Sequence, residues 1–337
     1  MRTFGFILCF AFSISVCAQI EDFEHISFYK ADSVAKSYYG ADLKSVPRLS
    51  YQLTQDLETD VEKLRSIFMW ITHNISNDNT VYERNKRKRR QFEHDSVKLI
   101  EWNHHIRRKT IATLLKKKKT VCTGYAYLLK EMCRYAGITS KIVNGFSRTA
   151  ETESEEIKTP NHSWNVVLLN GKWYLCDPTW ATGMFDPNTY TFDFEYQEGF
   201  FLGKPELFIK NHYPLEVQWT LLGEQTPTFE EFLEGPLFYN AAFDYGIVYH
   251  GALKMNNTVS KKKIISFQFD QLNPKEIQSV HLVLSTKRKD HRIEPKDLIV
   301  EKDSIRFNHR FLFKGYYDLH VMLNDEAIMT YSFHVKK

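Results

Sequence analysis

Three side chains that together can open an amide bond occur along the chain in the order cysteine, histidine, aspartate, as Cys122, His162 and Asp177. A thiolate attacks a carbonyl carbon, and an imidazole takes up and returns protons. A carboxylate fixes the tautomer of that imidazole and stabilises its charged form. These residues form one site only if the fold brings them together, and the sequence around each of them indicates that it does.

His162 and Asp177 belong to two strand-like runs joined by Asn170-Gly171. Asn-Gly favours a two-residue type I′ hairpin turn, which fixes the register of the two strands. In that register His162 and Asp177 are offset by two residues, so they share a face of the sheet as diagonal neighbours about 7–8 Å apart. The other side chains of this face are apolar: Trp164, Val166, Leu168, Trp173 and Leu175. We therefore expect a buried face that ends in a contact between imidazole and carboxylate.

Cys122 stands directly before a run of apolar residues at helical spacing that ends at Gly137. A helix that begins at Cys122 offers unpaired N–H groups and a partial positive charge, which favour thiolate over thiol. The same N–H groups could stabilise a tetrahedral oxyanion. Gly124, in the first turn, would permit a substrate backbone to approach closely.

Each residue also has a purely structural interpretation. A cysteine ahead of an apolar helix is commonly a small buried hydrophobe, and a histidine–aspartate pair in a hairpin is commonly a structural hydrogen bond. The three together, with His162 and Asp177 on one face, favour a catalytic site over either structural role.

The longer motifs around these residues resemble those of the transglutaminase-like (papain-like) superfamily. The core segments are 121–126, 162–166 and 173–180, the helix at 67–75 resembles the one that precedes that domain, and 211–214 with 219–222 resemble the kyphoscoliosis peptidase branch. The resemblance implies that Cys122 is the nucleophile, His162 the base and Asp177 the orienting carboxylate. The chain departs from the pattern at Asn77-Asp78, where Tyr-Asp is frequent, and in its lysine-rich segment 116–119.

The implied activity is acyl transfer through a thioester at Cys122, acting on amide bonds of peptides, proteins or cell-wall polymers. Hydrolysis is favoured over transamidation because the chain looks exported. The alternative is a non-catalytic scaffold that binds a peptide or wall fragment in the same groove, although retention of all three residues favours the enzyme.

No cofactor and no metal are expected, since His94, His104 and His105 have no cysteine or carboxylate at ligand spacing.

The remaining pattern predicts an α+β fold. Length and composition are those of a globular chain of two or three domains, with 337 residues of which 43% are hydrophobic and 26% charged. Residues 20–80 show helical periodicity, and short alternating strands follow residue 240. We expect a papain-like domain of helices on an antiparallel sheet at 19–239, followed by an Ig-like β-sandwich domain at 240–337.

The first 18 residues have the features of a secretory signal peptide. Arg2 precedes an apolar run at 4–16, and Val16-Cys17-Ala18 provides small residues for cleavage after Ala18. This predicts a periplasmic or extracellular protein, with lipoprotein anchoring at Cys17 as the alternative. Cleavage would leave Cys122, Cys133 and Cys176, too few for a disulfide framework.

A basic insert occupies residues 84–119. It holds 14 Lys/Arg against 3 acidic residues, a net charge of +11 in a chain whose total is +4. The run is interpreted as a solvated loop or helix face, because like charges stay hydrated. Export argues against nucleic acid as a partner and leaves contact with an anionic surface as the alternative.

Overall fold

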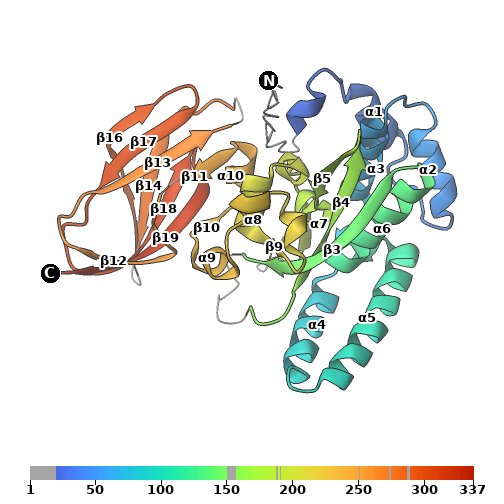
Figure 1. Ribbon diagram of the computed structural model, residues 1–337, viewed down its shortest axis with the longest axis horizontal. Coiled ribbons are helices and arrows are strands. Elements are labelled where there is room, and N and C mark those ends of the chain that lie inside the picture. The colour runs from blue at the N-terminus through green and yellow to red at the C-terminus, as the bar shows by residue number, and fades with distance from the viewer. Residues whose placement is uncertain are drawn as a thin grey trace, which may run out of the picture.

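The computed structural model describes residues 20–149, 157–186, 189, 191–249, 251–272, 275–286 and 289–337. Two parts lie side by side in Figure 1: helices around a five-stranded sheet, and a strand-rich part with a six-stranded and a four-stranded sheet. This confirms the predicted fold class. The signal peptide expected at 1–18 lies outside the described residues, and no helix within them has the length and apolar character needed to cross a membrane.

The helical part begins with four elements, the last of which is a long buried helix. They are η1 (Ile20–Phe23), α1 (Tyr29–Ser37), α2 (Val46–Thr54) and α3 (Asp60–Asn74). A capping box between Thr59 and Glu62 fixes the start of α3. The central part of α3 is buried, including Phe68 and Trp70, which are both 0% exposed. A helix that is apolar on most sides must be covered by neighbours, and α1, α2 and α6 cover it.

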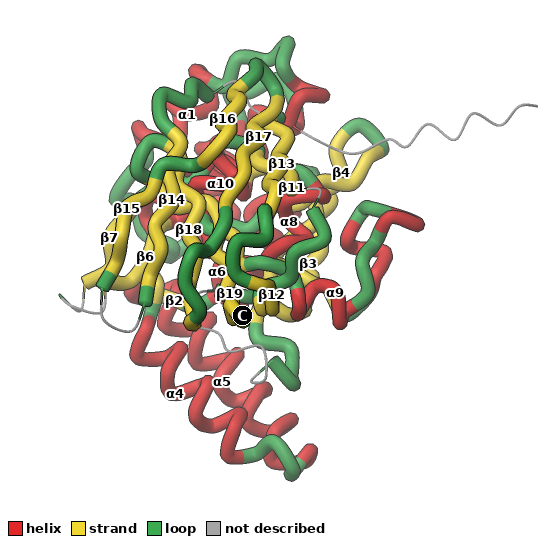
Figure 2. Tube along the Cα trace, turned by 90° about the vertical axis from the view of Figure 1, so that its left-hand side faces the viewer, coloured by secondary structure: helices red, strands yellow, loops and turns green. Residues whose placement is uncertain are grey.

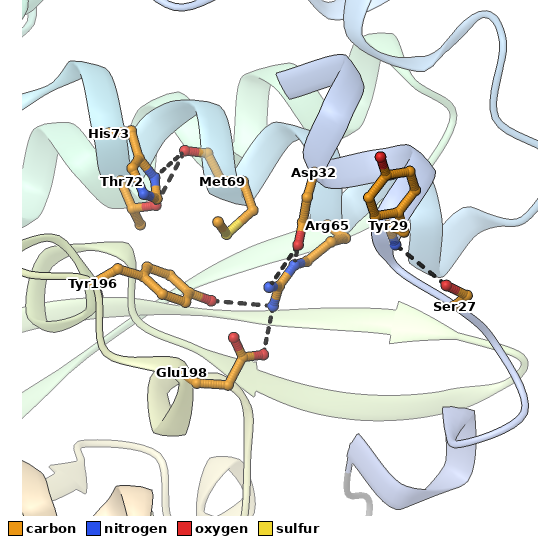
Figure 3. Close-up of polar contacts among 9 residues, drawn as sticks. All are labelled: Ser27, Tyr29, Asp32, Arg65, Met69, Thr72, His73, Tyr196 and Glu198. Carbon is orange, nitrogen blue, oxygen red and sulfur yellow. Dashed lines mark hydrogen bonds and ion pairs between the residues drawn. The ribbon is translucent and has the colours of Figure 1, made fainter. Parts of the chain in front are cut away.

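Arg65, on α3, ties this helix to distant segments (Figure 3). Its Nε and Nη2 donate to the two carboxylate oxygens of Asp32 at 2.7 and 3.2 Å, and its Nη1 lies 2.5 Å from Glu198 Oε1 and 3.1 Å from the Tyr196 hydroxyl. Its guanidinium carbon also lies 4.9 Å from the ring centroid of Phe201. A buried planar cation with two carboxylate partners joins α1, α3 and the segment at 196–198.

We expect Arg65→Gln to destabilise the fold by about 2 kcal/mol. Charged hydrogen bonds are lost, but the cost stays moderate because Asp32 and Glu198 remain partly exposed and regain water. Urea unfolding and hydrogen exchange on the 29–37 and 196–203 peptides measure the effect. The control is Arg134→Gln, which removes an exposed ion pair with Glu131. Equal destabilisation by the two variants would contradict the assigned role of Arg65.

The basic insert belongs to a helical hairpin that projects from the rest of the molecule (Figures 1 and 2). It runs through β1 (Ser76–Asn77), α4 (Asn79–Gln91), α5 (Ser96–Lys117) and β2 (Lys119–Thr120). The parallel pairs Ser76–Lys119 and Asn77–Thr120 hold its two ends together. No residue of α4 is fully buried, whereas α5 buries Ile106, Thr110 and Leu114. The charged helix faces are solvated, as the composition indicates.

The central sheet follows α6 (Cys122–Tyr135), whose C-terminal end is closed by Gly137 at φ +80°. Its order is β8-β5-β4-β3-β9, and every neighbouring pair is antiparallel. The strands are β3 (Thr139–Ser147), β4 (His162–Leu169), β5 (Lys172–Cys176), β8 (Phe201–Gly203) and β9 (His212–Pro214). Leu169 pairs with Lys172, and Asn170 and Gly171 have φ of 49° and 79°, which confirms the predicted hairpin.

Both faces of this sheet are covered, although the sequence predicted one apolar face and one mixed face. On the mixed face, Asn165 is fully buried and its amide donates to the Ala126 carbonyl of α6 at 3.0 Å. On the apolar face, Trp164 packs against Phe208 of α8, with ring centroids 6.1 Å apart. Hydrogen bonds to the helix allow a polar residue to occupy a buried face.

Short elements connect the sheet to the C-terminal part. They are α7 (Pro178–Thr182), β6 (Gly183–Asp186), β7 (Thr191–Phe194), η3 (Glu198–Phe200), α8 (Pro205–Asn211), η4 (Val217–Thr220), η5 (Gly223–Gln225) and α9 (Phe229–Glu234). Arg148, after β3, donates to the carbonyls of Phe232 and Gly235. Phe200 and Phe243 meet with ring centroids 4.7 Å apart. These contacts hold the two parts against each other.

The C-terminal part is a pair of facing sheets. One has the order β10-β19-β18-β14-β15, with β12 also on β19, and the other has the order β11-β13-β17-β16. Its elements are β10 (Leu237–Phe238), α10 (Asn240–Asp244), β11 (Ile247–Tyr249), β12 (Asn256–Ser260), β13 (Ile265–Gln271), β14 (Val280–Ser285), β15 (Asp290–Ile293), β16 (Lys296–Val300), β17 (Ser304–His309), β18 (Gly315–Leu323) and β19 (Glu326–Lys336). Phe267 of one sheet packs against Tyr331 of the other across the core, with their ring centroids 5.5 Å apart.

Candidate active site

His162 and Asp177 are in direct contact. His162 Nε2 lies 2.6 Å from Asp177 Oδ2, and both residues are buried. Asp177 follows β5 and caps α7, where its Oδ1 accepts from the N–H groups of Thr179 and Trp180 at 2.8 and 3.3 Å. One carboxylate oxygen is therefore fixed by the backbone, and the other faces the imidazole.

Cys122 completes the set through a side-chain hydrogen bond with His162. It is the first residue of α6, is partly exposed and is a free thiol. His162 opens β4, and β5 pairs only with positions 165–169 of that strand, so the first residues of β4 have no β5 neighbour. Because Nε2 faces Asp177, the imidazole has Nδ1 free for Cys122.

The charges of the three residues support one another. Burial acts to raise the pKa of Cys122, but its interactions with the His162 ring and the Ser163 N–H outweigh burial and hold that pKa below its ordinary value. Burial acts to lower the pKa of His162, yet Asp177 and Cys122 raise it to about 10. The pKa of Asp177 is lowered against the effect of burial by the two histidines around it. The arrangement favours a thiolate–imidazolium pair beside a carboxylate.

A second histidine, His212, contacts the same carboxylate. Its Nε2 lies 3.0 Å from Asp177 Oδ2, and its ring centroid lies 5.2 Å from that of His162. Burial is the main cause that lowers the pKa of His212 to about 4, so this ring is neutral and donates through Nε2. No role for His212 is predicted from the sequence. The motif at 211–214 was the available signal, but the contact depends on β9 lying two strands away from β4.

The ligand atoms of His162, Asp177 and His212 lie within 4.8 Å of one another, which raises the question of a metal. A zinc ion about 2.0–2.1 Å from each atom would hold its ligands about 3.3 Å apart. The observed 2.6 and 3.0 Å contacts to one oxygen are hydrogen-bond distances instead. The residues fit a proton-sharing cluster better than a metal centre.

Gly124 permits a close approach, but the neighbour is not the one expected. A Cβ at this position would lie 1.8 Å from Thr120 Oγ1. The glycine therefore lets β2 pass directly beside the first turn of α6, rather than leaving space for a substrate. Its role is to fix where the helix begins, and thereby where Cys122 lies.

The other two cysteines among the described residues lie in the core. Cys133, on α6, and Cys176, on β5, are both 0% exposed free thiols. Burial raises the pKa of Cys133 far above its ordinary value and that of Cys176 to about 12. Neither offers a reactive thiolate near neutral pH.

A cavity of about 270 Å³ adjoins Trp180. The Trp180 ring centroid lies 5.8 Å from that of His162. Arg148 and Gln197 line the cavity from the helical part, and Tyr239 and Glu326 line it from the C-terminal part. Residues from both parts of the chain thus line the cavity beside the candidate site.

Two kinds of comparison relate the chain to known proteins. The family model described as the transglutaminase-like superfamily matches residues 47–178, a range that contains Cys122, His162 and Asp177. Kyphoscoliosis peptidase of Homo sapiens is 31% identical over 261 residues, which are 75% of this chain and 35% of that protein. The chain belongs to the transglutaminase-like superfamily.

Other relatives agree with this assignment. Hillarin of Drosophila melanogaster is 29% identical over 240 residues, which are 66% of this chain and 26% of that protein. The chain thus spans about a third of the length of the curated relatives it matches. A crystal structure of a TGase aligns at 14% identity with a TM-score of 0.28, covering 45% of this chain and 32% of that chain. The assignment to the transglutaminase-like superfamily rests on the sequence matches.

Proposed function

We propose that this transglutaminase-like protein is a thiol acyl-transfer enzyme that opens amide bonds through a thioester at Cys122. The observation that carries the proposal is the position of the His162 imidazole, between the Asp177 carboxylate and the Cys122 thiol. Superfamily membership supports the same chemistry. Peptide, protein or cell-wall amides are the proposed substrates, and the proposed location is outside the cytoplasm.

The reaction divides into two steps. The Cys122 thiolate adds to the amide carbonyl carbon, and the resulting oxyanion collapses with cleavage of the C–N bond, while His162 gives its proton to the leaving amine. In the second step, His162 takes a proton from a water molecule as the water oxygen adds to the thioester carbonyl carbon. The C–S bond then breaks, so the thiolate re-forms and the carboxylic acid leaves. An amine in place of water would give transamidation, and we propose hydrolysis as the main outcome.

Selective alkylation tests whether the thiol is activated. At pH 6 an ordinary thiol of pKa ~8.5 is less than about 1% thiolate, so it reacts slowly with iodoacetamide. We expect Cys122 to react at least about tenfold faster than glutathione at this pH, because its lowered pKa means that more of Cys122 is already in the thiolate form. Its rate should also rise less steeply between pH 6 and 8. Peptide mass spectrometry identifies the labelled residue.

Two comparisons make this measurement decisive. The variant His162→Ala should lose the enhancement, since burial then raises the pKa of Cys122 without an opposing imidazole. Cys133 and Cys176 should stay unlabelled in the native protein. Glutathione-like reactivity of native Cys122 would instead favour a binding scaffold.

A further inference from the structure

Arg89 extends from the basic hairpin to the candidate active site. It lies near the end of α4, is partly buried, and its Nη2 donates to the Pro160 carbonyl at 2.6 Å. Pro160 stands two residues before His162 in the chain. The hairpin therefore contacts the segment that leads directly into the site.

That segment is held firmly, so the position of Arg89 is defined. The Asn161 side chain accepts from the Ser147 N–H at 2.6 Å and donates to the Ser147 carbonyl at 3.0 Å. Lys158 lies 4.0 Å from Glu93, which follows α4. At the other end of the helix, the β1–β2 pair anchors the start of α4 beside Cys122.

The charge of Arg89 is available to a ligand. Within the described residues it forms no ion pair with a carboxylate, and its hydrogen bond to Pro160 uses one of five N–H donors. Burial lowers its pKa, and the charge of Cys122 opposes this effect. The guanidinium thus lies close enough to Cys122 for their charges to interact. An unpaired guanidinium beside a nucleophile is suited to a carboxylate, which it can bind with two parallel hydrogen bonds.

We propose that Arg89 is a specificity residue that binds a carboxylate on the substrate next to the amide bond opened at Cys122. This inference rests on the proposed function and adds a substrate class to it, acidic peptides. The carboxylate could belong to an acidic side chain or to a free chain end. The remaining positive charge of the hairpin would draw such substrates toward the site.

Two alkylating reagents of similar size but different charge test the proposal. Iodoacetate carries a carboxylate and iodoacetamide does not, so the ratio of their rates at Cys122 reports the electrostatic attraction of a carboxylate to the site. Arg89→Gln should lower this ratio about fivefold. The control Arg87→Gln, which removes the same charge from an exposed position of α4, should leave it unchanged. Arg89→Lys should retain most of the wild-type ratio.

The ratio separates this proposal from the proposed function. A shift in the pKa of Cys122 changes the rates of alkylation by iodoacetate and by iodoacetamide by the same factor, so it cancels from their ratio. Equal ratios in Arg89→Gln and Arg87→Gln, with Cys122 still reactive toward iodoacetamide, would overturn the role of Arg89 alone. A wild-type Cys122 unreactive toward both reagents would overturn the proposed function and this inference together.

Protection from iodoacetamide identifies the source of the carboxylate. N-acetylglutamate α-amide offers only a side-chain carboxylate, N-acetylalanine offers only a chain-end carboxylate, and N-acetylglutamine α-amide offers neither. We expect one of the two acids to protect Cys122 in the wild type and not in Arg89→Gln, and the neutral compound to protect in neither. Protection by the neutral compound equal to that by both acids would contradict the proposal.

Discussion

Replacement of Cys122 by alanine is expected to reduce amide turnover to the uncatalysed background. The thioester cannot form without the sulfur, and the other thiols in the described part of the chain, Cys133 and Cys176, are buried with raised pKa values and cannot take its place. The fold should survive, since Cys122 is partly exposed at the start of α6 and alanine is a good helix former. The measurement is turnover of peptide amides, with intact-mass detection of an acyl adduct after acid quenching.

The matched control is Cys133→Ala, on the same helix. Losing a fully buried sulfur leaves a small cavity and should lower stability by about 1–2 kcal/mol. It should leave turnover per folded molecule unchanged. An acyl adduct on another residue, or turnover retained by Cys122→Ala, would show that the nucleophile has been assigned wrongly.

Asp177→Asn is expected to lower kcat by roughly 10² to 10⁴ with little change in the fold. The structure gives the reason. Oδ1 of Asp177 accepts from two backbone N–H groups of α7, so the amide oxygen of asparagine would be held in that position. The amide NH₂ would then face the rings of His162 and His212, whose Nε2 atoms now point toward a carboxylate oxygen. His162 would lose both its preferred tautomer and the charge that stabilises its protonated form.

His212→Gln provides the comparison for this prediction. Glutamine can keep a donor toward Asp177, and His212 is placed to position the carboxylate rather than to touch substrate, so we expect a loss of about tenfold or less. Kinetics, thiol labelling and circular dichroism should be measured for both variants. A folded Asp177→Asn protein with undiminished turnover and thiol reactivity would make the pair a structural hydrogen bond.

Local chemistry accounts for what the sequence predicted correctly about this site. The Asn170-Gly171 turn set the register, and the register placed His162 and Asp177 on one face. Apolar spacing and Gly137 bounded the helix that carries Cys122. Each of these signals acts over a few residues, which is the range at which backbone preferences and periodicity can be read.

Features that depend on packing between distant segments were not predictable in the same way. His212 meets Asp177 from a strand 35 residues further along the chain. The contact of Arg89 with Pro160 depends on the direction in which the hairpin projects, and composition alone indicated only a solvated charged face. The close neighbour of Gly124 proved to be Thr120, which a single glycine in a sequence cannot specify.

The pairing of β1 with β2 closes the base of the helical hairpin, so the hairpin can change independently of the candidate active site. Ser76 pairs with Lys119 and Asn77 with Thr120, so the residues between the two strands could lengthen or shorten without moving Cys122. Ile106 and Leu114 of α5 are buried, which limits how much of the hairpin can be removed. Evolution could therefore exchange the distal portion, Arg89 included, and alter substrate choice while the cysteine, histidine and aspartate stay in place.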